Sequence, residues 1–478
     1  MTKRPDPSRR ILLPSQEEVD ALLRSDIPSF LAKVFIELNP GVPFAGNFHH
    51  EAMAAALMEV MSGNCKRLNI SVPPRYLKSI TASVAFPAFV LGHNPAKRII
   101  CVSYSQGLAD KHSRDCRATM ESDWYHRLFP GTCLSTSTES HLVTTARGER
   151  FATSVGGTLT GLGADIIIVD DPLKPQDAYS EVARRAAREF YSGTLLSRLN
   201  DKNTGAIINV AQRLHPDDLT GLMLEEKGWK NLSLPAIAET DEIIPLMNGR
   251  SHLRRQGDVL HPERESKSLL DRIKANLGSA VFEAQYQQNP LPADSDLIRR
   301  AWFRTYADVD FAGGRSIEVV QSWDVATSDK ETADWSVCTT WWVKDDVYYL
   351  IDVFRARLRY PDLKRKIVSL AQTYGCTCVL IENKGTGQAL IQELQESGPI
   401  YPIPITPVHD KITRLAANTA VIEAGRVRLP MAAPWLEDFF AEVLRFPYGP
   451  HDDQVDSMSQ VLSYMETRRF PAVFRRQF

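Results

Sequence analysis

Residues 70–87 read ISVPPRYLKSITASVAFP. A short apolar run ends at a proline-bearing turn, and Lys78 and Ser79 directly precede an apolar stretch with helical character. In a phosphate-binding loop the lysine contacts the β- and γ-phosphates of a nucleotide and the next hydroxyl binds Mg²⁺, at a helix N-terminus. Val72 and Leu77 stand at the two glycine positions of that motif, so an ordinary helix start is the alternative. The predicted nucleotide ligands here are Pro74, Arg75, Tyr76, Leu77, Lys78 and Ser79.

A second motif, GLGADIIIVDDP (161–172), ends an apolar run with two adjacent acids, Asp170 and Asp171. At the carboxyl edge of a parallel sheet, one such acid binds the Mg²⁺ of a nucleotide and its neighbour orients the attacking water. Acids that follow a strand are also common in solvated turns. The two motifs occur in the order that an ATP-hydrolysing site requires, and each therefore supports the other.

Two further side chains are candidates for the same site. Gln212 follows the apolar run GAIINVA (205–211), a position from which it could contact the γ-phosphate and signal its loss. Arg75, within the phosphate turn, could supply positive charge to the transition state. The alternatives are a simple strand end for Gln212 and a plain surface arginine for Arg75.

The order of apolar runs predicts two α/β domains. Runs at 67–72, 98–104, 165–170 and 205–211 alternate with helix-like segments, which is typical of a mostly parallel, buried sheet. A second series at 317–326, 337–343, 347–356 and 376–383 places three strands close together before a helix, which favours a mixed sheet. We expect an N-terminal domain at 1–240, a linker region at 241–305, and a second domain at 306–478 that ends in a short basic tail.

Several acids of the second series have the spacing of a metal site. Asp324 ends the first of these strands, Glu382 ends the fourth, and Asp453 and Asp456 lie three residues apart on a predicted helix at 451–464. Cleavage of a phosphodiester with two metal ions needs carboxylates from separate elements that converge on cations roughly 4 Å apart. Each acid alone is better explained as a strand end or a helix cap, whereas the ordered set favours a metal site.

Composition limits the remaining possibilities. The chain has 478 residues, a formal charge of −2 and seven cysteines without paired CxxC spacing. The near-zero net charge restricts any DNA contact to a local patch, and the cysteine pattern favours a reducing compartment over a disulfide framework. No apolar stretch approaches the length of a membrane span and no leader-like segment begins the chain, so we expect no membrane association.

The ordered set of PPRYLKS, SYSQGLADKHSRDC (103–116), GGTLTGLGADIIIVDDP, LLSRL, QRLHPDDLTG and FEAQYQQNP resembles the large terminase subunit of tailed bacteriophages, over about residues 30–465. That family often has PPRHGKS in the phosphate loop and Asp-Glu after the second motif, so Tyr76, Leu77 and Asp171 depart from its pattern. The resemblance implies a Rossmann-like P-loop ATPase domain followed by a ribonuclease-H-like nuclease domain. It also implies that Asp324 and Glu382 are the first two nuclease acids, with Asp456 as the first candidate for the third and Asp453 as the second.

The same resemblance implies cofactors, partners and a location. ATP with Mg²⁺ would serve the first site, and two Mg²⁺ or Mn²⁺ ions the second. The partners would be double-stranded DNA, a small terminase subunit and a portal protein, with a homo-oligomeric ring formed on the procapsid. The protein would work in the cytoplasm of the bacterial host and transiently at the portal. A helicase-like ATPase with a non-cleaving DNA-binding domain and a capsid-assembly adaptor with decayed sites are the alternatives.

Overall fold

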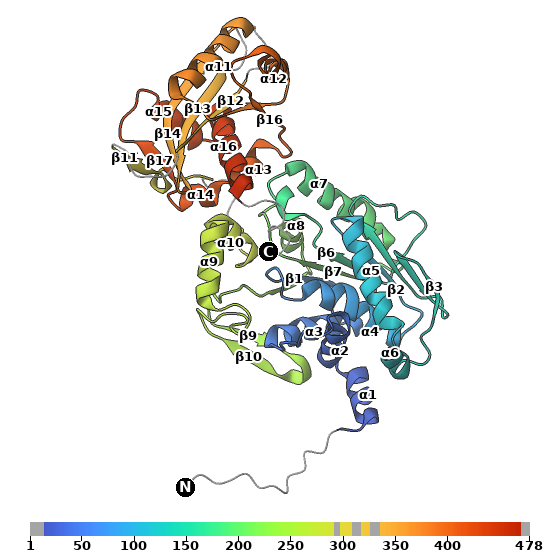
Figure 1. Ribbon diagram of the computed structural model, residues 1–478. Helices are drawn as coiled ribbons and strands as arrows, with labels where there is room; N and C mark the ends of the chain where they lie inside the picture. The colour runs from blue at the N-terminus through green and yellow to red at the C-terminus, as the bar shows by residue number, and fades with distance from the viewer. Residues whose placement is uncertain (1–13, 291–296, 308–316, 326–334, 470–478) are drawn as a thin grey trace, which may run out of the picture. The chain divides into compact units, whose positions relative to one another are not determined.

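The computed structural model describes residues 14–290, 297–307, 317–325 and 335–469 (Figure 1). Within them the chain forms two compact units. The first contains residues 14–270 and 283–290, and the second contains residues 271–282 and the described residues from 297 onward.

The first unit is built on a mostly parallel sheet. In spatial order its strands are β3 (Leu134–Ser137), β4 (His141–Thr144), β5 (Glu149–Ser154), β2 (Arg98–Ser103), β6 (Ile166–Asp170), β7 (Ala206–Ala211), β1 (Arg67–Ser71) and β8 (Lys230–Ser233). From β5 to β8 all neighbours are parallel, whereas β4 is antiparallel to both β3 and β5. Every residue of β6 and of β7 is buried, as expected for parallel strands covered on both faces.

Helices cover both faces of this sheet. One face packs against α1 (Gln16–Ser25), α2 (Ile27–Leu38), α3 (Phe48–Met61), the π-helical turn η1 (Ile80–Ala85), α4 (Phe86–His93), α5 (Gln106–Met120) and α6 (Asp123–Leu128). The other face packs against η3 (Phe190–Thr194), η4 (Leu195–Arg198) and α8 (Leu219–Glu225). The turn η2 (Pro175–Asp177) and α7 (Glu181–Glu189) precede η3 in the chain.

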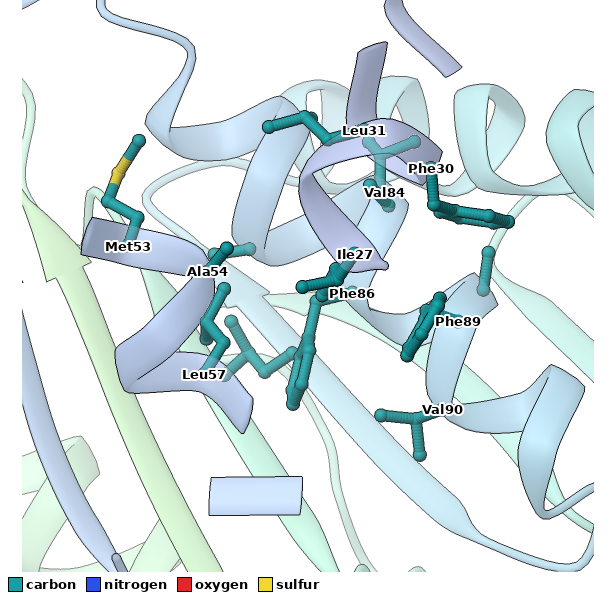
Figure 2. Close-up of a cluster of buried hydrophobic side chains, with 14 of the residues drawn as sticks. Ile27, Phe30, Leu31, Met53, Ala54, Leu57, Val84, Phe86, Phe89 and Val90 are labelled. Atoms are coloured by element: carbon teal, nitrogen blue, oxygen red, sulfur yellow. The ribbon is translucent and has the colours of Figure 1, made fainter. Parts of the chain in front are cut away.

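Aromatic and aliphatic side chains from helices and η1 fill the first of these layers (Figure 2). Phe30 of α2 is fully buried, and its ring makes an edge contact with Phe89 of α4 at 5.3 Å. Val84 of η1 and Leu57 of α3 lie in the same cluster. Truncation of a buried phenylalanine in such a core costs about 3–5 kcal/mol, so this layer fixes η1 firmly beneath the phosphate turn.

The segment 241–305, for which the sequence predicts a linker, contains regular structure. It holds β9 (Glu242–Pro245), η5 (Met247–Gly249), β10 (Ser251–Arg254), α9 (Lys267–Leu277), α10 (Ser279–Gln285), η6 (Arg300–Trp302) and the start of β11 (Arg304–Tyr306). Ile244 and Leu260 are buried in the core of the first unit. The domain boundaries at 240 and 305 stay predictions, because a domain is a segment that folds independently of the rest of the chain.

The second unit has a mixed sheet. In spatial order its strands are β11, β17 (Val427–Pro430), β14 (Val347–Ala356), β13 (Ser336–Lys344), β12 (Glu318–Asp324), β15 (Cys378–Glu382) and β16 (Ile403–Ile405). The consecutive strands β12, β13 and β14 are antiparallel, and β15 lies parallel to β12. This arrangement confirms the mixed sheet and the strands predicted from the second series of apolar runs.

Helices again cover both faces. One layer contains α11 (Tyr360–Tyr374) and α12 (Thr386–Ser397). The other contains α13 (Lys411–Ala416), α14 (Thr419–Glu423), α15 (Leu436–Val443) and α16 (Asp453–Arg469). The end of the basic tail, 470–478, lies outside the described residues. Among the helices of the described ranges, none has the length and apolar character required to cross a bilayer.

Candidate functional sites

The phosphate turn and the paired acids meet at the carboxyl edge of the first sheet. Lys78 is buried, and its Nζ lies 3.0 Å from Oδ2 of Asp171. Ser79 donates a hydrogen bond from Oγ to Oδ1 of Asp170, at 3.0 Å. Two direct contacts therefore join the phosphate turn to the paired acids, one for each acid.

The backbone of this turn adopts conformations that favour glycine. Leu77 has φ 61° and Arg75 has φ 69°, and Asp171 after β6 has φ 45°. The left-handed region costs an L-residue other than glycine about 1–2 kcal/mol. At position 77 the phosphate-loop motif has glycine, so the chain departs from the motif in residue type but retains a backbone conformation that glycine adopts easily.

Two opposing effects act on the pKa values of Asp170 and Asp171. Burial raises the pKa of Asp170, and this rise is opposed by hydrogen bonds from Ser83 and Ser79 and by the charge of Lys78. Burial likewise raises the pKa of Asp171, against the attraction of Lys78. The hydroxyl of Ser79 and the two carboxylates are hard oxygen donors, which is the ligand type that Mg²⁺ prefers. The residues present therefore fit Mg²⁺ bound together with a nucleotide.

The other predicted nucleotide ligands differ in what they contact. Arg75 is exposed and Pro74 is partly exposed. Tyr76 is buried, and its hydroxyl donates a hydrogen bond to Oε2 of Glu265 at 2.8 Å. The structure thus gives Tyr76 a partner in its own unit that sequence reasoning did not identify.

Gln212 lies beside Asp171. Its backbone N–H donates to Oδ1 of Asp171 at 3.3 Å, and its buried side-chain Oε1 has no hydrogen-bond partner among the described residues. Both residues line a small cavity of about 10 Å³, close to the volume that one water needs. The neighbouring Arg213 is instead bound to Asp218, with both carboxylate oxygens 3.0 Å from Nε.

In the second unit, four acids surround one edge of the sheet. Asp324 ends β12, Glu382 ends the adjacent parallel strand β15, and Asp453 and Asp456 lie in the first turn of α16. Burial, followed by repulsion from Asp456, Glu382 and Asp453, raises the pKa of Asp324 well above its usual range. The sequence selected these acids from three separate elements. In the structure they lie close enough for the charges of Asp456, Glu382 and Asp453 to raise the pKa of Asp324.

Two basic residues of α13 neutralise part of this charge. Lys411 Nζ lies 2.7 Å from Oδ2 of Asp456, and Arg414 Nη2 lies 2.7 Å from its Oδ1. Arg414 also approaches Glu382, with Nη1 at 3.7 Å from Oε2. Sequence reasoning missed both cations, and their spacing of three residues in DKITRLA was the one signal that could have located them.

Oxygen donors of this kind suit Mg²⁺ or Mn²⁺. In the part of the chain that the structure describes, however, no three or more Asp, Glu, His or Cys side chains come close enough together to hold a metal ion. The acids share a sheet edge, but Lys411 and Arg414 are the groups that balance them here. A metal bound at this edge would compete with these ion pairs.

Fold and site geometry together define a class of protein: an α/β unit in which a lysine- and serine-bearing turn meets two strand-end acids, followed by a mixed α/β unit with acids at one sheet edge. Residues 321–465 match the family model of the terminase RNase-H-like domain.

Solved structures agree with this class. The large terminase of the thermophilic bacteriophage D6E matches with a TM-score of 0.51 and 10% identity, over 86% of this chain and 98% of that one. The structure of the same protein in complex with ADP matches with a TM-score of 0.50 and 10% identity, and also covers 86% and 98%. The complex with ATP-γ-S has a TM-score of 0.50 and 10% identity, covering 85% and 98%. The search of curated proteins found no match. The chain thus resembles large terminase subunits, and the predicted order of an ATPase-type fold and an RNase-H-like fold is confirmed.

Proposed function

We propose that this chain is a large terminase subunit that hydrolyses ATP to move double-stranded DNA into a procapsid and cuts the DNA concatemer. The observation that carries the proposal is that one chain holds both sites: Lys78 and Ser79 in contact with Asp171 and Asp170, and Asp324 among three further acids. A capsid-assembly adaptor with decayed sites would have no reason to retain either arrangement.

In the first site, Lys78 would exchange its ion pair with Asp171 for the phosphates of ATP. Mg²⁺, held by Ser79 and Asp170, would neutralise phosphate charge. Asp171, once released from Lys78, would orient the attacking water, and Arg75 is exposed at the turn where it can approach the nucleotide. Gln212, in contact with Asp171, would respond to loss of the γ-phosphate.

ATP turnover by site variants tests this assignment. We expect Lys78→Ala to abolish most ATPase activity, because the charge of the lysine acts in a buried site. Asp171→Asn should bind nucleotide without hydrolysing it, whereas Asp170→Asn should impair Mg²⁺-dependent hydrolysis. Normal turnover by Lys78→Ala would refute the phosphate-loop assignment, and normal turnover by Asp171→Asn would place the catalytic acid elsewhere.

In the second site, divalent metal would activate water and stabilise the charge of the scissile phosphate. Asp324 and Glu382 would bind the metal, together with Asp456 or Asp453. Mn²⁺-dependent plasmid cleavage by Asp324→Asn, Glu382→Gln, Asp453→Asn and Asp456→Asn tests this, and loss in only one helix variant would identify the third ligand. Undiminished cleavage by Asp324→Asn or Glu382→Gln would overturn this metal site, whereas a parent chain without Mn²⁺-dependent cleavage would favour a helicase-like ATPase with a non-cleaving DNA-binding domain.

The partners follow from the same proposal. A packaging subunit would bind double-stranded DNA, a small terminase subunit and a portal protein, and would form a ring on the procapsid. It would work in the cytoplasm of the bacterial host and at the portal during filling. Co-sedimentation of the full chain with procapsids that carry or lack the portal tests this docking, since binding should require the portal.

A further inference from the structure

A fully buried arginine lies behind the paired acids of the first unit. Arg150 of β5 has no exposed surface, and its Nη2 donates to the backbone oxygen of Ser83 at 2.8 Å. Its Nε and Nη1 have no hydrogen-bond partner among the described residues. A buried guanidinium is costly unless a negative charge lies near it, and the acid whose ionised form Arg150 favours is Asp170.

Ser83 connects this arginine to Asp170. Ser83 is buried in η1, and its Oγ donates to Oδ2 of Asp170 at 2.7 Å. Ser79, one turn earlier, donates to the other oxygen, Oδ1. His112 of α5 is also buried, with Nδ1 at 3.4 Å from Oδ2. Each oxygen of the carboxylate therefore has a hydroxyl donor, and the groups on the Oδ2 side are buried.

We propose that Ser83, supported by Arg150, is a positioning residue that holds Oδ2 of Asp170 and so keeps Oδ1 turned toward Ser79, the hydroxyl that would share Mg²⁺. Without the hydrogen bond from Ser83, the carboxylate could rotate away from that orientation. Groups that orient a metal ligand in this way typically contribute 10–100-fold to metal affinity or activity. The inference rests on the proposed function, since it takes Asp170 and Ser79 as the residues that bind Mg²⁺.

The test is Mg²⁺-dependent binding of a fluorescent, non-hydrolysable ATP analogue to the full chain. For Ser83→Ala we expect the Mg²⁺ concentration at half-saturation to rise about tenfold or more, with binding in EDTA within about twofold of the parent. Ser113→Ala is the matched control, because Ser113 is a buried serine of α5 whose hydroxyl has no hydrogen-bond partner among the described residues. This control should leave both measurements unchanged.

Two arginine variants extend the test. Arg150→Lys keeps the positive charge and should shift the Mg²⁺ requirement less than Arg150→Met does. If neither variant folds, Ser83→Ala still decides the question, because it removes a single hydroxyl. Equal Mg²⁺ dependence in Ser83→Ala and Ser113→Ala, or an equal loss of binding with and without Mg²⁺, would overturn the inference alone. A parent chain that binds no nucleotide in either condition would instead overturn the proposed function.

Discussion

Leu77 has a strained backbone at one of the two positions where the phosphate-loop motif has glycine. Its φ of 61° is open to a leucine at a cost of about 1–2 kcal/mol, but a β-branched side chain is a genuine outlier there. We expect Leu77→Ile, which conserves volume, to lower the free energy of unfolding by about 1–2 kcal/mol.

Leu77→Gly should change the free energy of unfolding by less than about 1 kcal/mol, because relief of strain offsets the greater flexibility of the unfolded chain. Urea unfolding of the two variants beside the parent checks this contrast. Equal destabilisation by both would mean that lost packing, and not backbone strain, dominates at Leu77.

Asp453 makes the second unit sensitive to pH. Burial, with repulsion from Glu442 and Asp452, raises its pKa to about 6. The folded state therefore holds this proton where the unfolded state has lost it, and stability falls as pH rises from about 4 through 6. We expect Asp453→Asn to gain stability over the parent across that window, by about 3 kcal/mol at most.

Unfolding in EDTA at pH 4, 6 and 8 measures this difference. Asp438→Asn, at an exposed acid of α15, is the control and should show a constant difference from the parent. A difference for Asp453→Asn that does not grow between pH 4 and pH 8 would contradict the prediction.

At the scale of single residues, the sequence located the acids at strand ends but not the side chains that contact those acids. Asp170 and Asp324 each follow an apolar run, so position alone selects them. Ser83 contacts Asp170, and Arg414 contacts Asp456, only after segments distant in the sequence pack together. Neither lies at a strand end; no local pattern distinguishes Ser83 from an ordinary helical residue, and the spacing of Arg414 from Lys411 is the only local signal for Arg414.

At the scale of elements, one buried hydroxyl of α16 joins that helix to two neighbouring strands, β12 and β13. Ser457 Oγ donates to the backbone oxygen of Ser322 at 2.7 Å and accepts from the backbone N–H of Thr339 at 3.1 Å. Ser457→Ala leaves these groups without a partner in a dry layer, and we expect a loss of about 1–3 kcal/mol in the free energy of unfolding. Ser459→Ala is the control on the same helix, because the buried hydroxyl of Ser459 has no hydrogen-bond partner among the described residues.

Since Asp456 immediately precedes Ser457, this variant should also weaken Mn²⁺-dependent cleavage while ATP turnover stays unchanged. Unfolding curves and the two activity assays are the measurements. A loss in Ser459→Ala equal to that in Ser457→Ala would show that the hydrogen bonds of Ser457 contribute little.

The apolar runs predicted strands well because buried parallel strands consist of uninterrupted aliphatic residues. The run at 165–170 becomes β6 (Ile166–Asp170) in this way. The run at 347–356 becomes β14 (Val347–Ala356), which is antiparallel to β13 and was located by its aromatic and β-branched residues. The antiparallel edge formed by β3 and β4 escaped prediction, since these strands are short and polar. The π-helical turn η1 escaped it too, because its sequence, ITASVA, suits an α-helix equally well.

At the scale of the whole molecule, the two units have separate hydrophobic cores. We therefore expect two unfolding transitions, each sensitive to a different ligand. A nucleotide analogue with Mg²⁺ at a hundred times its dissociation constant should stabilise one transition by about 2.7 kcal/mol, and Mn²⁺ alone should stabilise the other.

Differential scanning calorimetry of the parent, Lys78→Ala and Asp324→Asn tests this assignment. Lys78→Ala should lose the response to nucleotide and keep the response to Mn²⁺, whereas Asp324→Asn should do the opposite. A single transition that responds to both ligands would mean that the units unfold together.

The buried charges at the first site also bear on how the chain can evolve. Lys78 and Arg150 are cations, Asp170 and Asp171 are anions, and hydrogen bonds or ion pairs join them directly or through Ser83. A mutation that neutralises one of them leaves an opposite charge uncompensated in the interior, at a cost of about 3–5 kcal/mol against a total stability of about 5–15 kcal/mol. Single losses would therefore be selected against through stability as well as through activity. A related chain that no longer hydrolyses ATP should therefore have lost these residues in pairs, one cation with one anion. A relative that lacks only one of the four would have changed recently, and a relative that lacks a cation together with an anion would have changed long ago.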